Sequence, residues 1–151
     1  MDDEHGTDAG AVYIVFGKSP FDGLTKHLED LPTFGRGAKI LGLPGSELGY
    51  ETHGAGDVNG DGIADILVSS KLGGGTVYVI YGSSSSDWTQ PLVEGSFGQA
   101  AHTLTAPAAD QAPSGFGAGT AGGADLNKDL LCDVAICTNA RCYVVLDAKT
   151  A

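Results

Sequence analysis

Internal repetition constrains the fold of this chain more than any other property of its sequence. The stretch GGTVYVIYG, which ends at Gly82, echoes AGAVYIVFG, which ends 65 residues earlier at Gly17. CYVVLD at 142–147 echoes both, and LGYETHGAGDVNGDGIADILV at 48–68 parallels SGFGAGTAGGADLNKDLLCDVAI at 114–136. Such a period is typical of one blade of a β-propeller, with four strands and their loops.

We therefore predict an all-β fold with four antiparallel strands in each blade. The predicted division is residues 1–17 as the last strand of a preceding or neighbouring blade, 18–82 as a first blade and 83–151 as a second, divergent blade. Strands are expected near 38–41, 49–55, 64–69 and 76–81, and again near 102–105, 115–122, 132–138 and 142–147. About two blades and one orphan strand cannot close a propeller, so we expect a partial propeller or one completed by other chains.

The local patterns within each repeat favour strands. VYVIY and VYIVF are apolar at every position, as expected of strands that are covered on both faces. The 24 glycines alternate with β-branched and aromatic runs, which indicates many tight turns. DGLTKHLEDL at 22–31 spaces three leucines at helical intervals, so it is either a short helix or a long loop.

Composition and charge narrow the possible partners. The chain is 42% hydrophobic and 18% charged, which is enough apolar residue to bury a core. Its formal net charge of −11 opposes binding to nucleic acid or to an anionic membrane, and favours cations. No apolar stretch is long enough to span a bilayer, so we expect no direct membrane insertion.

DVNGDGIAD at 57–65 has the spacing of a metal-binding loop. With Asp57 at position 1, Asn59, Asp61 and Asp65 occupy positions 3, 5 and 9, and Ile63 at position 7 can offer its backbone carbonyl. These ligands are all oxygen, as Ca²⁺ prefers, and three converging carboxylates would repel each other without a counter-ion. We therefore predict a calcium site.

Two alternatives bear on this loop. An EF-hand is excluded because position 12 is Val68, where that motif needs a bidentate glutamate. The other alternative is a plain turn, in which Asn-Gly and Asp-Gly bend the chain and the aspartates cap backbone amides. The turn interpretation does not account for the acids at both ends of the loop, and we keep it as the competing hypothesis.

A second loop in the same chain carries the same ligand types. These are Asp125, Asn127, Asp129 and Asp133 at positions 1, 3, 5 and 9, with Leu131 at position 7. Lys128 and Leu130 replace Gly60 and Gly62, and a side chain is disfavoured wherever the turn needs positive φ. The second loop is therefore the weaker calcium candidate.

The core GDVNGDGIADILV, preceded by LGY and followed by GTVYVIYG, resembles the FG-GAP repeat of integrin α-subunit β-propellers and other surface proteins. The resemblance implies four-stranded blades with Ca²⁺ held in a loop between two strands. Matched by position, the implied ligands are Asp57, Asn59, Asp61, the Ile63 carbonyl and Asp65. The second repeat matches more loosely, and SSKLG and CTNAR stand where the Gly-Ala-Pro signature is expected.

The three cysteines allow one short-range disulfide. Cys137 and Cys142 flank the turn TNAR between two predicted antiparallel strands, so they are placed to pair and leave Cys132 free. Three reduced, buried cysteines remain the alternative, whereas their spacing fits no usual zinc site.

These features predict a noncatalytic, calcium-binding module of an extracellular or cell-surface protein, acting in adhesion, protein–protein interaction or assembly. No nucleophile elbow, phosphate loop or HExxH motif is present in the sequence. Other blades or protein subunits are the expected partners, with glycans as further candidates. The alternative is a scaffold or carbohydrate-binding part of a larger extracellular hydrolase or lyase. We also expect that the isolated chain does not function as a monomer.

Overall fold

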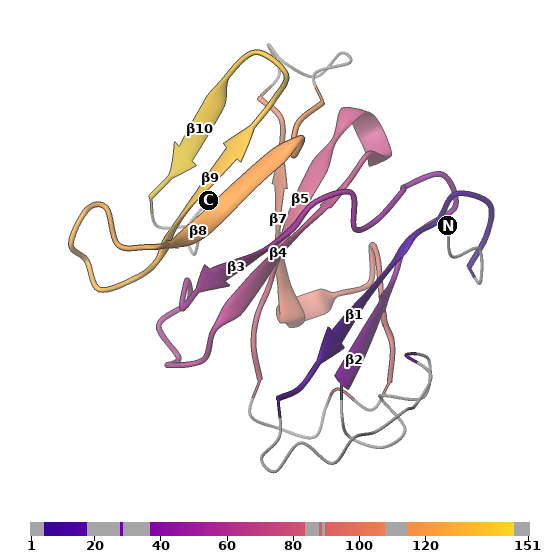
Figure 1. Ribbon diagram of the computed structural model, residues 1–151, viewed down its shortest axis with the longest axis horizontal. Helices are drawn as coiled ribbons and strands as arrows, with labels where there is room; N and C mark the ends of the chain where they lie inside the picture. The colour runs from indigo at the N-terminus through magenta and orange to yellow at the C-terminus, as the bar shows by residue number, and fades with distance from the viewer. Residues whose placement is uncertain are drawn as a thin grey trace.

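The computed structural model describes residues 5–17, 28, 37–83, 88, 90–107 and 115–146 (Figure 1). Over these residues the elements are β-strands and short 3-10 turns, which confirms the all-β class. The strands are β1 Ala11–Val15, β2 Gly37–Leu41, β3 Thr52–Gly56, β4 Asp65–Ser70, β5 Thr76–Ile80, β6 Leu92–Val93, β7 Ala101–Thr105, β8 Gly119–Ala124, β9 Asp133–Cys137 and β10 Cys142–Val145. The 3-10 turns are η2 Leu72–Gly74 and η4 Gly98–Ala100.

The described strands form three small sheets. The central sheet has the order β3-β4-β5-β7, and each of its neighbouring pairs is antiparallel. The sheet β10-β9-β8 lies on one side of it and the sheet β1-β2-β6 on the other (Figure 1). The central sheet is thus a four-stranded propeller blade of the predicted kind, between two partial ones.

Two strand pairs cross the boundaries between the repeats. β2, expected as the first strand of the first blade, pairs with β1 instead, in the register Ala11 to Leu41. β7, expected in the second blade, likewise pairs with β5 as the outer strand of the central sheet. Each repeat therefore gives its first strand to the preceding sheet, and β1 is an edge strand of the sheet β1-β2-β6. Sequence repetition shows which segments are equivalent, but it does not show which segments pair.

β3 and β8, the strands that precede the two aspartate loops, begin later than predicted. β3 starts at Thr52 rather than near 49, and β8 at Gly119 rather than near 115. Gly49 and Gly117 adopt positive φ values of 89° and 82°, which interrupt an extended strand. A Cβ on Gly117 would lie 2.9 Å from the side chains of Ser69 and Val77, so this tight approach also requires glycine.

Two apolar clusters hold the sheets together. Leu67, Val77 and Val79 of the central sheet pack with Val134 and Ile136 of β9. The alternate residues Val68, Tyr78 and Ile80 pack with Ile40 of β2 on the other face. All five residues of β5 are consequently buried, as its continuous apolar pattern predicts. β1 carries the same pattern but is only half-buried, because it lies at the edge of the described sheet.

A buried carboxylate joins the central sheet to its β2 neighbour. Glu94 is almost fully buried and accepts hydrogen bonds from the Tyr78 hydroxyl and the Leu43 amide, both at 2.8 Å. Burial and this hydrogen bond raise the pKa of the Tyr78 hydroxyl above its ordinary value. The contact therefore ties β5 to the chain that follows β2.

Two further predictions concern local features. The disulfide is confirmed: Cys137 and Cys142 are directly opposite in the β9–β10 pair and are bonded, and Cys132 is a free thiol. The possible helix at 22–31 lies outside the described residues, except for Leu28.

Candidate metal centre

The first aspartate loop, residues 57–64, connects β3 to β4 and is organised by the carboxylate of Asp57. This group accepts backbone amides from Gly60 at 2.7 Å, Asp61 at 3.2 Å and Gly62 at 2.8 Å. Gly60 and Gly62 adopt positive φ values of 81° and 82°, which turn their amides toward Asp57. One side chain thus fixes the path of the loop.

The other predicted ligands lie in the same loop. The Asn59 side-chain amide donates to Asp61 Oδ2 at 2.9 Å, and Asp61 Oδ1 accepts the Ile63 amide at 2.7 Å. Asp65, which is 1% exposed, accepts the Val58 amide at 2.9 Å and the Gly82 amide at 2.8 Å. The five residues predicted from spacing therefore belong to one hydrogen-bonded unit.

Negative charge is concentrated at the base of this loop. Burial raises the pKa of the Asp65 carboxyl above its ordinary value, whereas the amides of Gly82 and Val58 lower it. The charges of Asp61 and Asp57 raise this pKa further. The three aspartates therefore repel one another electrostatically, and a cation would relieve that repulsion.

The placement of the side chains fits a metal ion only in part. Among the described residues, no group of three His, Cys, Asp or Glu side chains stands close enough to hold one. The carboxylates are instead directed at backbone amides, as the turn interpretation predicts. A carboxylate has about four lone-pair sites, so one that accepts amides can also accept a cation. The chemistry of the donor set fits Ca²⁺, and the loop also forms without one.

The second aspartate loop, between β8 and β9, repeats this network. Asp125 accepts the amides of Lys128 at 2.6 Å, Asp129 at 3.1 Å and Leu130 at 3.0 Å. The contacts of Asn127 and Asp129 also match those of the first loop, including the Leu131 amide on Asp129 Oδ1 at 2.9 Å. Lys128 and Leu130 adopt positive φ values of 66° and 74°. The substitutions that we expected to disturb this turn are accommodated as local backbone strain.

The last aspartate of the second loop differs from its counterpart. Asp133 is 2% exposed, and its Oδ2 accepts the Leu126 amide at 2.6 Å. Its Oδ1 is buried without a hydrogen-bond partner, whereas the corresponding oxygen of Asp65 is bonded to Gly82. A buried carboxylate oxygen without a partner is costly, and a bound cation would supply one.

The first loop also forms part of the junction between two sheets. The Cys132 amide at the end of the second loop donates to the Asp57 carbonyl at 2.8 Å. Val58 is 1% exposed and belongs to the apolar cluster shared with β9. An ion that fixed the first loop would therefore also steady the contact between neighbouring blades.

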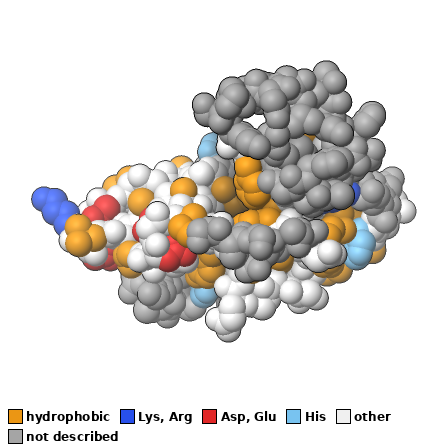
Figure 2. Space-filling view, turned by 90° about the horizontal axis from the view of Figure 1, so that it is seen from below, with side chains coloured by type: hydrophobic (Ala, Val, Ile, Leu, Met, Phe, Trp, Pro, Cys, Tyr) orange, Lys and Arg blue, Asp and Glu red, His pale blue; other side chains and the backbone are white. Residues whose placement is uncertain are grey.

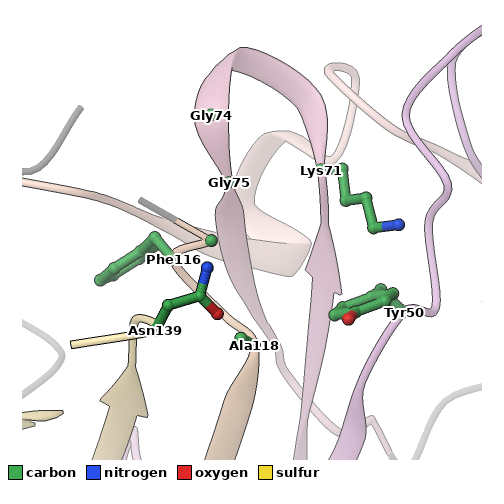
Figure 3. Close-up of a pocket in the computed structure, with 8 residues that line it drawn as sticks. Tyr50, Lys71, Gly74, Gly75, Phe116, Ala118 and Asn139 are labelled. Atoms are coloured by element: carbon green, nitrogen blue, oxygen red, sulfur yellow. The ribbon is translucent and has the colours of Figure 1, made fainter. Parts of the chain in front are cut away.

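A cavity of about 300 Å³ lies at the other end of β4 and β5 and was not predicted (Figure 3). Lys71 pairs with Glu47 at 2.6 Å and lies 4.3 Å from the centre of the Tyr50 ring. Asn139 lies across the cavity from Tyr50, below the turn at Gly74 and Gly75 (Figure 3). No local motif marks this cavity, because its lining comes from separate segments that only the fold brings together.

The central sheet has four antiparallel strands, and equivalent strands occur in the neighbouring sheets. An aspartate loop follows β3 in one repeat and β8 in the next. These features define a repeat module of the β-propeller type. Residues 49–80 match the family model of the FG-GAP repeat, which confirms the resemblance seen in the sequence. The matched stretch contains β3, the Asp57 loop, β4 and β5. Such repeats point to a β-propeller module of extracellular proteins.

No curated protein matches the chain. None of the helices in the described part of the chain is long and apolar enough to cross a membrane.

Proposed function

We propose that this chain is a noncatalytic, calcium-binding propeller module of a secreted or cell-surface protein, which acts in adhesion, protein–protein interaction or assembly. One observation carries the proposal: two loops 68 residues apart form the same hydrogen-bond network around the same oxygen-bearing side chains. A plain turn does not require carboxylates at positions 1, 5 and 9. Both loops have all three carboxylates, as expected if each loop binds its own cation.

Calcium would act structurally in this proposal. Asp57, Asn59, Asp61, the Ile63 carbonyl and Asp65 would hold one ion, and the matching residues of the second loop another. The first loop packs against the start of β9 through Val58 and the Cys132 amide. Neutralising its aspartates would therefore stabilise the junction between sheets and so the surface that the blades present.

Thermal unfolding tests the calcium proposal directly. The melting temperature is measured with excess Ca²⁺, with excess Mg²⁺ and with EGTA. A ligand bound only to the folded state, at a hundredfold excess over its Kd, adds about 2.7 kcal/mol of stability. We expect a clear rise with Ca²⁺ and a smaller one with Mg²⁺, which demands a more regular octahedral site. The same melting temperature in Ca²⁺ and EGTA would contradict the proposal.

The cavity beside Tyr50 favours a second candidate function, carbohydrate binding within a larger extracellular enzyme. Tyr50 is 51% exposed, and the Asn139 amide faces it across the cavity. An exposed aromatic ring beside a few polar groups is a common form of small-ligand site. Calorimetric titration with neutral oligosaccharides should show binding that Tyr50→Ala abolishes and Asp57→Asn leaves unchanged. No heat of binding with the unmodified chain would rule this candidate out.

A further inference from the structure

The tip of the second aspartate loop presents a hydrophobic side chain in a strained conformation. Leu130 is 90% exposed and has a φ of 74°, and Leu126 in the same loop is 62% exposed. Figure 2 shows acidic, basic and hydrophobic side chains together at the tapered end of the molecule, where this loop lies in Figure 1. A solvated leucine at a position suited to glycine contributes nothing to folding, and such strain is usually associated with a functional contact.

The first loop indicates which of these side chains would face a neighbouring sheet. Val58, the counterpart of Leu126, is buried against β9. A Cβ on Gly60, the counterpart of Lys128, would lie 3.0 Å from Leu131. A Cβ on Gly62, the counterpart of Leu130, would meet nothing within 4 Å, even though a sheet packs beside that loop. Blade packing therefore does not account for Leu130.

The same chain contains a cavity that complements this tip. It lies beside the first loop, has a volume of about 350 Å³ and includes Tyr81, Trp88 and Leu92 in its lining. Asp61 and Asn59 also border it. A leucine would find an apolar surface there, and Lys128, two residues before Leu130, would find a carboxylate.

We propose that Leu130 of one copy inserts into the cavity beside Tyr81 and Trp88 of a second copy, and that Lys128 pairs with that copy's Asp61 while the first loop is free of calcium. The contact joins two different surfaces, so it is head-to-tail and can extend into a ring or a filament. Burial of one leucine accounts for a factor of roughly ten to one hundred in affinity, so the self-association is weak and depends on concentration.

The test is made in EGTA, so that its outcome does not depend on calcium binding. Trp88 is the only tryptophan of the chain and lines the cavity, so its fluorescence reports on occupation of the cavity. With rising protein concentration, we expect a larger sedimentation coefficient and a blue shift of tryptophan emission. Leu130→Gly should weaken association at least about tenfold and abolish the shift. This variant gains the residue that suits positive φ, so misfolding would not explain the loss.

A mixing experiment tests the head-to-tail geometry. Leu130→Gly keeps the cavity, and Trp88→Ala keeps the tip, so neither variant should assemble alone. An equimolar mixture should form pairs that do not grow further. The proposal is overturned if the unmodified chain sediments as a monomer at every concentration, or if Leu130→Gly associates normally. Leu130-dependent binding to phosphatidylcholine vesicles by a monomeric chain would assign the tip to a membrane instead.

Discussion

The two aspartate loops reach the same backbone conformation with different residues. In the first loop glycine occupies both left-handed positions, at 60 and 62, whereas lysine and leucine occupy them in the second. Asp57 and Asp125 each accept three amides in the same arrangement. The first aspartate therefore determines the conformation of the turn, and glycine only lowers the conformational energy of that turn. That energy is higher in the second loop by roughly 1 kcal/mol for each substituted position.

The loops also differ in how they end. Both oxygens of Asp65 accept amides, whereas Asp133 has one buried oxygen without a partner. The first loop is also packed against a neighbouring sheet, while the second is exposed along residues 125–130. The first loop is therefore held by its protein contacts, whereas Asp133 of the second loop keeps one carboxylate oxygen available for a cation.

The largest effect is expected from removing the first aspartate of each loop. Asp57→Ala leaves three loop amides without their acceptor and loosens the turn that packs Val58 against β9, which should cost about 4 kcal/mol. Asp125→Ala should cost about half as much, because residues 125–130 are exposed and take no part in the apolar cluster that holds Val58. Urea unfolding in EGTA measures both without any metal contribution. Equal losses would show that packing against β9 adds nothing to the first loop.

The next largest effect is expected in the stability that Ca²⁺ adds, which should depend more on the first loop than on the second. The stability gained from Ca²⁺ over EGTA, about 2.7 kcal/mol at a hundredfold excess over Kd, should mostly disappear in Asp61→Asn. Asp129→Asn should remove a smaller part, because the substituted glycines make the second loop the weaker site. Thermal unfolding of each variant in both buffers provides the values. The reverse order would indicate that the unpaired oxygen of Asp133 matters more than backbone strain.

The closing aspartates should respond differently to loss of charge. Asp65→Asn places an amide group where two backbone amides donate, so it should cost about 2 kcal/mol in EGTA. Asp133→Asn keeps an acceptor for Leu126 and removes a buried negative charge, so its cost should be within about 1 kcal/mol. Chemical denaturation of the two variants compares them. A large loss at Asp133 would reveal a partner for its second oxygen.

The smallest effect on stability is expected from substitutions at Leu130 and Gly62, which both have positive φ. Leu130→Gly should stabilise the fold by about 1 kcal/mol, and Gly62→Leu should destabilise it by about the same amount. The two substitutions are reciprocal, so they calibrate each other in a single denaturation series. If neither changes the midpoint, the positive φ values carry no strain.

Sequence reasoning located the strands and the loops because repetition reveals equivalent segments. It also placed the disulfide, since Cys137 and Cys142 are close along the chain. It did not assign β2 and β7 to the right sheets, because pairing depends on contacts across the chain rather than on similarity. The cavity at Tyr50 and the buried Glu94 were missed for the same reason: each depends on residues that only the fold brings together.

The order of strands along the chain makes the first two sheets inseparable. After β5 of the central sheet, the chain returns to β2, where β6 pairs in parallel, and then comes back as β7. A cut at any single point between β3 and β6 therefore divides both sheets, and a cut elsewhere between β2 and β7 divides one of them. Neither sheet can be exchanged as an independent building block, so recombination between such proteins would succeed only where it respects this interlacing. The shortest segment that could be exchanged as a folding unit would then be longer than one sequence repeat.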